Sequence, residues 1–347
     1  MRTTVIGAGA WGTALARLLF ISKREVCLWG RDIDSLVALE SSGKNERYLP
    51  DINLPVGIPT QPNLIKAVER ADCLVLAVPS SAFREITAQL NQFNGVVVSV
   101  TKGIEFDSGL TMSGIVRENM PLAKVVALSG PTLAEEVCRD MPTAAVSASK
   151  YPEAAAVVQG IFHRPSFRVY TSKDPIGVEL GGALKNVIAI AAGASAGLGF
   201  GDNSKAALVT RAIAEIRRLG LACGANPDTF SGLGGLGDLT VTCFSNLSRN
   251  YQFGQRIGRG EKLTDILASS ASAIEGFPTS RSAWNLARKR KVDTPIIDEV
   301  YAMLHKGKDL RQALLDLTTR SSKEEDLIKF LVYSIEFKAN ACGFVFE

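Results

Sequence analysis

Residues 3–12 read Thr-Thr-Val-Ile-Gly-Ala-Gly-Ala-Trp-Gly, and the apolar helical pattern of residues 13–20 follows at once. The segment predicts a short buried strand, a tight glycine-rich turn and a helix, and residues 25–29 predict the next strand. G-x-G-x-x-G between a strand and a helix is typical of a dinucleotide-binding turn. Such a turn needs glycine for the sharp bend, for close approach of a pyrophosphate and for close helix packing, and the three positions here are Gly7, Gly9 and Gly12. The helix N-terminus would offer unpaired N–H groups to the phosphates.

The end of the second predicted strand bears on which dinucleotide would bind. Arg31 and Asp32 follow one another there. An acidic residue at this place usually binds the ribose hydroxyls of NAD, whereas an arginine suits the 2′-phosphate of NADP. Because both residue types are present, NAD and NADP both stay open. Arg31 favours NADPH, and the alternative is that Arg31 is an ordinary solvated side chain.

Strands and helices continue to alternate up to about residue 170. Apolar runs predict strands at 72–79, 95–100 and 125–128, and helical patterns occupy 83–90 and 133–138. This alternation predicts an α/β fold with a Rossmann-type, doubly wound parallel sheet. Ligands of such sheets bind beyond the carboxyl ends of the strands, where we expect Pro79-Ser80, Lys102 and Gly130–Thr132. Thr132 and Glu135 also predict a capping box for the last of these helices.

The pattern changes after residues 167–170. No strand alternation follows, and helices are predicted at 176–194, 206–219, 249–257, 280–289 and 296–304. Residues 171–175 are typical of a linker. We therefore expect a Rossmann-type dinucleotide-binding domain at 1–172, an all-helical substrate-binding domain at 173–326 that also forms a homodimer, and a C-terminal extension of unknown role at 327–347.

Composition argues against several other classes of protein. The 347 residues suffice for two domains, and 46% hydrophobic with 21% charged residues is typical of a folded chain. The net charge of +4 is too small to favour nucleic acid, and no uncharged run reaches the roughly 18 residues that a membrane span requires. The six cysteines include no C-x-x-C pair and the two histidines are isolated, so we expect no metal site. Free thiols and the lack of a signal-peptide pattern indicate a cytoplasmic protein.

A dinucleotide site beside a helical domain suggests an oxidoreductase, which needs a group that carries a proton. His163 and His305 are the only histidines, and their surroundings favour structural or surface roles. Lysine is the next candidate, because burial can lower its pKa towards neutrality. Lys185 is the one charged residue of the helical stretch 181–190 and follows the pair Gly181-Gly182. Its side chain either reaches out to solvent or lies in a cleft, and the small glycines favour the cleft.

Two polar segments of the second domain complete the candidate site. The glycine-rich stretch 232–237 leads to Asp238, and its alternative is a plain flexible loop. Ser248-Arg249-Asn250 opens a helix with a hydroxyl, a guanidinium and an amide together. Backbone N–H groups, the positive end of the helix dipole and an arginine make an anion site that is best suited to phosphate. The alternative is an N-cap serine followed by a surface arginine.

Together these segments resemble one family, the soluble bacterial NAD(P)-dependent glycerol-3-phosphate dehydrogenases. The similarity runs from residue 3 to about residue 325. The motifs that carry it are Gly-Ala-Gly-Ala-Trp-Gly (7–12), Thr-Lys-Gly (101–103), Ser-Gly-Pro-Thr (129–132), Leu-Gly-Gly-Ala-Leu-Lys-Asn (180–186), Gly-Leu-Gly-Asp-Leu (235–239), Ser-Arg-Asn (248–250) and Glu-Gly (275–276). Several such blocks in the same order are far more specific than any one of them alone.

The resemblance implies reversible reduction of dihydroxyacetone phosphate to sn-glycerol 3-phosphate by hydride transfer, with NADPH or NADH, in support of phospholipid synthesis. It implies Lys185 as the catalytic residue, which accepts the proton when the alcohol is oxidised. Substrate binding would involve Lys102, Gly130, Thr132, Lys185, Asp238, Ser248, Arg249 and Asn250. Cofactor binding would involve Gly7, Gly9, Ala10, Trp11, Gly12, Arg31, Lys102, Ala134, Arg249, Ala273 and Glu275. Asn186 and Thr242 would support these groups.

The sequence departs from this family at two places. A longer polar side chain is more usual at Pro278, and the extension at 327–347 has no counterpart. Two other interpretations stay open. One is another β-hydroxyacid-type dehydrogenase of the same two-domain plan, which the phosphate segment at 248–250 disfavours. The other is a nucleotide-binding sensor without turnover, in which Lys185 and Asp238 would be idle.

Overall fold

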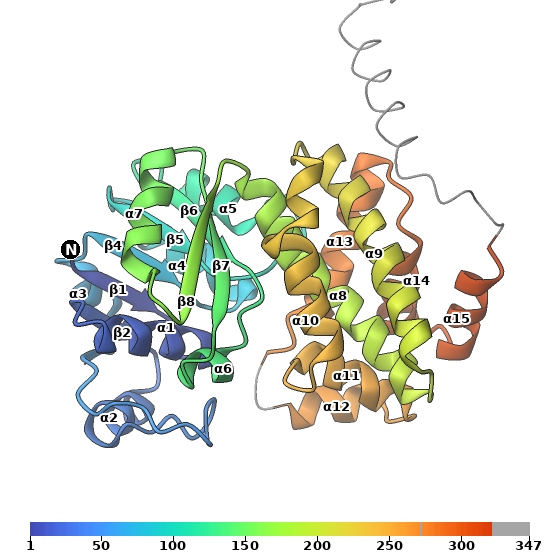
Figure 1. Cartoon of the computed structure of the whole chain (residues 1–347), viewed down its shortest axis with the longest axis horizontal. Helices are drawn as coiled ribbons and strands as arrows, with labels where there is room; N and C mark the ends of the chain where they lie inside the picture. The colour runs from blue at the N-terminus through green and yellow to red at the C-terminus, as the bar shows by residue number, and fades with distance from the viewer. Residues whose placement is uncertain (271–272, 321–347) are drawn as a thin grey trace, which may run out of the picture.

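The computed structural model describes residues 1–270 and 273–320, which form an α/β half and a helical half side by side (Figure 1). The strands are β1 (Thr3–Ile6), β2 (Val26–Trp29), β3 (Thr60–Gln61), β4 (Cys73–Leu76), β5 (Val96–Ser99), β6 (Lys124–Ser129), β7 (Thr143–Ala148) and β8 (Phe167–Ser172). The helices of the α/β half are α1 (Ala10–Ile21), α2 (Ile33–Ser42), α3 (Leu64–Val68), α4 (Ser80–Ala88), α5 (Met112–Asn119), α6 (Ala134–Cys138) and α7 (Pro152–Phe162). The helical half contains α8 (Pro175–Gly197), α9 (Asp202–Ala222), the 3₁₀ turn η1 (Pro227–Ser231), the π-helical turn η2 (Leu233–Gly237), α10 (Asp238–Phe244), α11 (Arg249–Gly258), α12 (Leu263–Ser269), α13 (Gly276–Arg290), α14 (Pro295–Lys306) and α15 (Leu310–Thr318).

The eight strands form one sheet in the order β3-β2-β1-β4-β5-β6-β7-β8. In β1, which is completely buried, Thr3 pairs in parallel with Val26 of β2 on one side and with Cys73 of β4 on the other. Successive side chains of a strand point to opposite faces. Val5 therefore packs in the core under α1 and α7, whereas Ile6 packs in the core under α3, α4 and α5. Helices cover both faces of the sheet, which confirms the doubly wound α/β fold.

One pair of strands departs from the expected parallel sheet. β7 runs antiparallel to β6, with Ala127 opposite Ala148. A parallel return would require a connection that runs back along the whole strand. The connection here contains one short helix, α6, of five residues, and the chain turns back beside β6. The next strand, β8, then pairs in parallel with β7.

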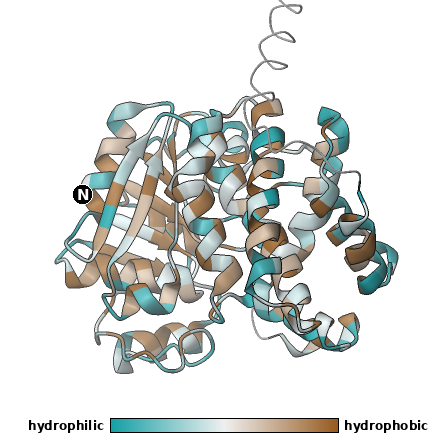
Figure 2. Cartoon of the chain, turned by 45° about the vertical axis from the view of Figure 1, so that its right-hand side comes forward, coloured by the Kyte–Doolittle hydropathy of each residue, from teal (hydrophilic) through white to brown (hydrophobic). Residues whose placement is uncertain are grey.

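The helical half is built around α8, on which α9, α10, α11, α13 and α14 pack. By length and composition α8 could cross a membrane, but 89% of its most apolar segment is buried inside the protein. Close packing on α11 explains two glycines. A Cβ at Gly193 would lie 2.0 Å from the backbone oxygen of Tyr251, and a Cβ at Gly254 would lie 2.1 Å from that of Ile190. Buried hydrophobic side chains fill the remaining contacts between these helices. In Figure 2 the brown colour of hydrophobic residues recurs along the helical ribbons.

Most predicted elements are confirmed with small shifts at their ends, and several were not predicted, among them α2, α5, β7 and α7. The predicted capping box is wrong. Leu133 is the N-cap residue of α6, and the hydroxyl of Thr132 donates instead to the backbone oxygen of Gly130 (3.1 Å), so Glu135 has no hydroxyl partner at the N-cap. The glycine-rich stretch 232–237 is not a flexible loop, because η2 continues directly into α10.

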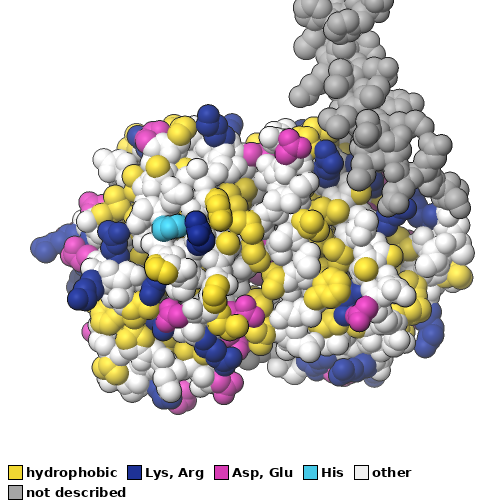
Figure 3. Space-filling view, in the orientation of Figure 1, with side chains coloured by type: hydrophobic (Ala, Val, Ile, Leu, Met, Phe, Trp, Pro, Cys, Tyr) yellow, Lys and Arg dark blue, Asp and Glu magenta, His cyan; other side chains and the backbone are white. Residues whose placement is uncertain are grey.

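The two halves of the molecule are joined between β8, which ends at Ser172, and α8, which begins at Pro175. Asp174 caps α8 by accepting a hydrogen bond from the amide of Gly177 (3.0 Å). On the face shown in Figure 3, basic and acidic side chains are interspersed over both halves, and hydrophobic side chains gather near the seam between them. The extension expected at 327–347 lies outside the described residues.

Candidate active site

A cleft of about 520 Å³ lies at the carboxyl ends of β1, β2, β4 and β5 and is closed on its other side by the helical half. It brings together most of the predicted site residues. Those that line it are Gly7, Gly9, Ala10, Trp11, Arg31, Lys102, Thr132, Ala134, Lys185, Ser248, Arg249, Asn250, Ala273 and Glu275. Three predicted residues do not line it, namely Gly12, Gly130 and Asp238. These three lie behind the lining and contact it, as described below.

The glycine-rich turn forms one wall of the cleft, and packing within the protein requires glycine at two of its three glycine positions, Gly7 and Gly12. Gly7 has φ +122°, which favours glycine, and a Cβ there would lie 2.5 Å from the backbone oxygen of Ala77. A Cβ at Gly12 would lie 1.9 Å from the oxygen of Gly7, so Gly12 lets α1 approach the turn. A Cβ at Gly9 would meet nothing within 4 Å, and no side chain caps the first N–H groups of α1. The turn therefore has the open space and the free donors that a pyrophosphate requires.

The end of β2 presents Arg31 and Asp32 to the same cleft. Asp32 is the N-cap residue of α2. One of its carboxylate oxygens accepts from the amide of Ser35 (3.1 Å), and the other accepts from the hydroxyl of Ser35 (2.8 Å). These hydrogen bonds lower the pKa of Asp32. The acid at this position is thus engaged in holding α2, whereas Arg31 is exposed and forms no ion pair with the described residues.

Two lysines from different halves of the molecule meet at one buried carboxylate. Asp238, the first residue of α10, is completely buried. One of its oxygens accepts from Lys185 Nζ, and the other accepts from Lys102 Nζ (2.5 Å). Lys185 Nζ also donates to Thr242 Oγ1 (2.7 Å), and Lys102 Nζ donates to the backbone oxygen of Gly130 (3.5 Å). Asp238 therefore holds both ammonium groups side by side at the wall of the cleft.

The surroundings of Lys185 suit it to exchange a proton near neutral pH. Its side chain is only 8% exposed, and burial lowers the pKa of Lys185 to about 7. The charge of Asp238 opposes this effect, and the charge of Lys102 adds to it. A general acid or base works best when its pKa lies near the pH of the reaction. The histidines, by contrast, do not line the cleft: His163 Nδ1 accepts from the amide of Val169, and His305 bonds to a serine hydroxyl.

Close packing of α8 against η2 determines where these groups lie. A Cβ at Gly181 would lie 2.2 Å from the backbone oxygen of Gly234, and a Cβ at Gly182 would lie 2.7 Å from Ser129 Oγ. The glycine pair therefore lets η2 and the end of β6 approach α8 one turn before Lys185. The π-helical turn ends where α10 begins, at Asp238. Such turns occur frequently at functional sites, because they shift the side chains that follow them.

The N-terminus of α11 forms a further part of the cleft wall. Ser248 is the N-cap residue, and its hydroxyl oxygen accepts from the amide of Tyr251 (3.2 Å). The hydroxyl hydrogen stays available to a ligand, because this bond uses only a lone pair. Arg249 follows, and its Nη1 donates to the backbone oxygen of Ala273 (3.1 Å). The arrangement combines the positive end of a helix dipole with a guanidinium, which suits a phosphate.

Asn250 is fixed from two sides. Its Nδ2 donates to Asn186 Oδ1 (3.0 Å), and its Oδ1 accepts from the amide of Gly276 (2.9 Å). A Cβ at Gly276 would lie 2.6 Å from the backbone oxygen of Asn186, so glycine is needed at the start of α13. Asn186 is the neighbour of Lys185 on α8. The amide pair therefore connects the anion site on α11 to the helix that carries the catalytic candidate.

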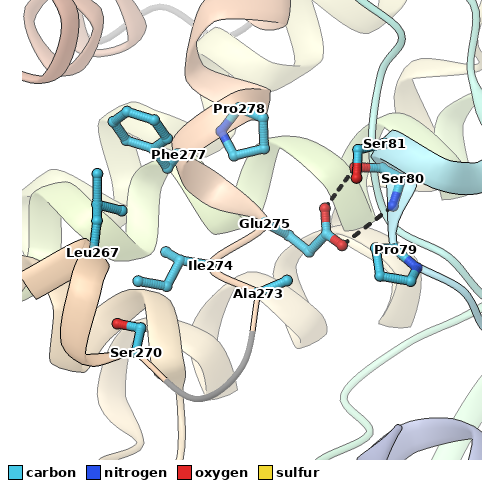
Figure 4. A pocket seen from close by; sticks show the side chains of 10 residues that line it. All are labelled: Pro79, Ser80, Ser81, Leu267, Ser270, Ala273, Ile274, Glu275, Phe277 and Pro278. Atoms are coloured by element: carbon cyan, nitrogen blue, oxygen red, sulfur yellow. Dashed lines mark hydrogen bonds between the residues drawn. The ribbon is translucent and has the colours of Figure 1, made fainter. Parts of the chain in front are cut away.

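Glu275 connects the helical half to the α/β half beside a second cavity of about 360 Å³ (Figure 4). Its carboxylate accepts from the amide of Ser80 (3.3 Å) and from the hydroxyl of Ser80 (2.6 Å). Ser80 is the first residue of α4, and the N-cap residue of this helix is Pro79, whose side chain has no hydrogen-bond acceptor. Glu275 therefore accepts from the donors at this helix end. Burial raises the pKa of Glu275, and the hydrogen bonds from Ser80 oppose that effect. Pro278 lines the second cavity and not the main cleft.

Some residues of the cleft were not predicted from the sequence. Among them are Trp29, Ser35, Arg47, Tyr48 and Leu49. Arg47 and Tyr48 belong to a short polar loop after α2, and nothing in its sequence distinguishes it from a solvated surface loop. Of the pair Pro79-Ser80, which was expected at the ligand-binding edge of the sheet, Pro79 lines the main cleft and Ser80 lines the second cavity.

Comparison with known proteins identifies the family of the chain. The family model of the NAD-dependent glycerol-3-phosphate dehydrogenase N-terminus matches residues 2–155, and that of the C-terminus matches residues 174–315. The NAD(P)+ glycerol-3-phosphate dehydrogenase of Geobacter sulfurreducens is 46% identical over 330 residues, which cover 93% of this chain and 98% of that protein. The crystal structure of glycerol-3-phosphate dehydrogenase from Coxiella burnetii superposes on this chain with a TM-score of 0.88 at 34% sequence identity. The match covers 92% of this chain and 99% of the Coxiella chain. The chain therefore belongs to the family of NAD-dependent glycerol-3-phosphate dehydrogenases.

Proposed function

We propose that this chain reversibly reduces dihydroxyacetone phosphate to sn-glycerol 3-phosphate with NADPH or NADH, and that it supplies phospholipid synthesis in the cytoplasm. The observation that carries the proposal is the contact of the buried Lys185 with Asp238. This contact lies in the same cleft as a glycine-rich nucleotide turn and the anion site at Ser248–Asn250. The relatives named above share the fold and carry the name of this activity, which supports the proposal.

Lys185 is the residue that moves the proton. Its ammonium donates a proton to the carbonyl oxygen of the substrate during reduction, and its neutral amine accepts the proton of the hydroxyl during oxidation. A bound nicotinamide supplies the hydride to C2 in the first direction and receives it in the second. Asp238 and Thr242 hold Nζ in place through their hydrogen bonds. Proton transfer thus requires no histidine.

Lys102 and α11 orient the substrate. The ammonium of Lys102 stabilises negative charge that develops on the carbonyl oxygen during hydride transfer. Ser248, Arg249 and the backbone N–H groups of the first turn of α11 receive the phosphate. Gly130, Thr132 and Asn250 complete the substrate site around them. When the phosphate is fixed at α11, the reacting carbon is held beside Lys185, which removes much of the entropic cost of bringing the groups together.

The α/β half binds the nucleotide. The residues at the N-terminus of α1, Gly9, Ala10 and Trp11, receive the pyrophosphate. Ala134, Ala273 and Glu275 line the same cleft and complete the nucleotide site. We propose that NADPH is preferred, because the exposed guanidinium of Arg31 at the end of β2 carries the positive charge that suits a 2′-phosphate.

A spectrophotometric assay tests the proposed reaction. The purified protein is incubated with dihydroxyacetone phosphate and either NADPH or NADH, and the loss of reduced-nicotinamide absorbance is followed in parallel. We expect oxidation that requires the ketone and is faster with NADPH. Dihydroxyacetone without its phosphate is the control, and it should react poorly if α11 binds the phosphate. Nucleotide binding without oxidation would instead favour the sensor interpretation, and activity confined to non-phosphorylated keto acids would favour another dehydrogenase.

Two further aspects of the proposal concern the whole chain. We propose that nucleotide binding belongs to the domain at 1–172 and substrate binding to the domain at 173–326, with the extension at 327–347 following them. We also propose that two chains associate as a homodimer. Light scattering coupled to size-exclusion chromatography should then give twice the 37.1 kDa of one chain. A mass of one chain over a wide concentration range would contradict the dimer.

A further inference from the structure

The loop after α2 is held firmly against the glycine-rich turn. Asn45 is buried, and its Nδ2 donates to Thr13 Oγ1 (2.8 Å) and to the backbone oxygen of Ala8 (3.2 Å). The loop closes on itself, because the amides of Tyr48 and Leu49 both donate to the backbone oxygen of Asn45 (3.2 and 2.8 Å). In the view of Figure 1, α2 and the segment after it lie below α1. The loop is therefore a built part of the nucleotide site, although it is remote from the turn in the sequence.

Arg47 lies in the middle of this loop and lines the cleft together with Arg31, Asp32 and Ser35. Its side chain is exposed, and its guanidinium lies 5.3 Å from the centre of the Tyr48 ring. Among the described residues Arg47 has no acidic partner within ion-pair distance. Its charge does reach the end of β2, because it contributes, after the hydrogen bonds from Ser35, to the lowered pKa of Asp32. Two arginines from separate segments therefore face the part of the cleft at the end of β2.

We propose that Arg47 is a specificity-determining residue that, together with Arg31, binds the 2′-phosphate of NADPH. A guanidinium offers several N–H donors in a fixed fork that matches phosphate oxygens, and two of them can neutralise a dianionic phosphate. The carboxylate of Asp32 beside them accepts hydrogen bonds from Ser35 and caps α2. Asn45 acts as the positioning residue of the loop. The inference deepens the proposed function and rests on its nucleotide specificity.

The test is an equilibrium measurement that does not depend on turnover. Reduced-nicotinamide fluorescence is titrated with the protein to give the dissociation constants of NADPH and NADH, and adenosine 2′,5′-bisphosphate and adenosine 5′-monophosphate are then used as competitors. We expect Arg47→Gln to raise the dissociation constants of NADPH and of the bisphosphate by about 10-fold, as for the loss of one charge-assisted hydrogen-bonding partner. The dissociation constants of NADH and of the monophosphate should change by less than about 2-fold. Lys44→Gln is the matched control: it removes the same charge from the same loop, and Lys44 Nζ donates to Asn53 and does not line the cleft.

The possible results separate the inference from the proposed function. If Arg47→Gln lowers the affinity for all four ligands by the same factor, the inference is overturned and Arg47 has a general electrostatic role. An unchanged ratio of NADPH to NADH affinity in this variant, while Arg31→Gln lowers it, would leave the proposed NADPH preference intact and overturn the role of Arg47 alone. If the wild-type chain binds neither nucleotide, the proposed function fails, and the inference fails with it. A selective loss of the two 2′-phosphorylated ligands, absent in Lys44→Gln, would establish the assignment.

Discussion

At the scale of single residues, the proposed chemistry depends on the ammonium of Lys185. We expect Lys185→Ala to lower kcat by at least ~100-fold in both directions, because the substitution removes the group proposed to transfer the proton. Folding should persist, since Lys102 still pairs with Asp238 in this variant. Steady-state rates measure the effect, and Lys173→Ala serves as a control because Lys173 is exposed and does not line the cleft. Retained activity in Lys185→Ala would remove this residue from its proposed role.

The lowered pKa of Lys185 leads to a prediction about how the rates depend on pH. In the proposed mechanism the neutral amine is the base of alcohol oxidation, so kcat/KM for glycerol 3-phosphate should rise as the pH increases through the pKa of about 7 and level off above it. In the same mechanism the ammonium is the acid of ketone reduction, so kcat/KM for dihydroxyacetone phosphate should fall over the same range. Initial rates in both directions, from about pH 6 to 9, test this opposition of the two profiles. Two profiles that rise or fall together would show that a different group controls the pH dependence.

At the scale of secondary structure elements, the contact between α8 and η2 positions Asp238. We expect Gly181→Ala to disrupt this contact, because the new Cβ would lie 2.2 Å from the backbone oxygen of Gly234. The turn must then move, which should lower the free energy of unfolding by about 2 kcal/mol and reduce kcat, as Asp238 moves with it. Urea unfolding and steady-state kinetics measure both effects. In the control Gly160→Ala, on α7, the Cβ meets nothing within 4 Å, so stability should rise slightly and activity should stay unchanged.

Some secondary structure elements can be predicted well from the sequence and others cannot. β1, the glycine-rich turn and α1 could be predicted because their pattern is local: an apolar run, three spaced glycines and a helical period. The antiparallel direction of β7 could not, because it depends on how far the short α6 can carry the chain. Thr132 and Glu135 match a capping box in sequence, but Thr132 bonds to Gly130 in three dimensions. A sequence motif specifies the residue types, but the tertiary structure determines which hydrogen-bond partner each side chain finds.

At the scale of the whole molecule, the site exists only where the two halves meet. Lys102 and Asp238 are 136 residues apart in sequence and hydrogen-bonded in the structure. Sequence reasoning identified both residues separately, from a glycine-flanked lysine after a strand and an aspartate after a glycine-rich stretch. It did not predict that one carboxylate would hold two lysines, because this depends on how the halves pack. The loop with Arg47 escaped prediction for the same reason, since tertiary contacts such as those of Asn45 with the glycine-rich turn bring it to the cleft.

Another contact between the halves allows a prediction about their cohesion. Glu179 of α8 is buried, and its carboxylate accepts from the amide of Ser113 (2.7 Å) and from the hydroxyl of Ser113 (2.5 Å) in the first turn of α5. Glu179→Ala leaves both donors without their partner inside the interface. We expect the free energy of unfolding to fall by about 3 kcal/mol, because each buried donor left unpaired costs 1–3 kcal/mol.

Urea unfolding of Glu179→Ala should also show a smaller m-value if the halves then unfold separately, because each transition exposes less surface than the unfolding of the whole molecule. Glu153→Ala is the matched control, since Glu153 is exposed and pairs with Lys124 at 3.1 Å on the surface, and its loss should change stability by no more than about 0.5 kcal/mol. Equal losses in the two variants would mean that the Glu179 contact contributes no more than a surface ion pair. The cohesion of the halves would then rest on their other contacts. These include the hydrogen bond from Asn285 Nδ2 to the backbone oxygen of Phe106 (2.8 Å) and the bonds of Asp238 and Glu275, which are themselves parts of the candidate site.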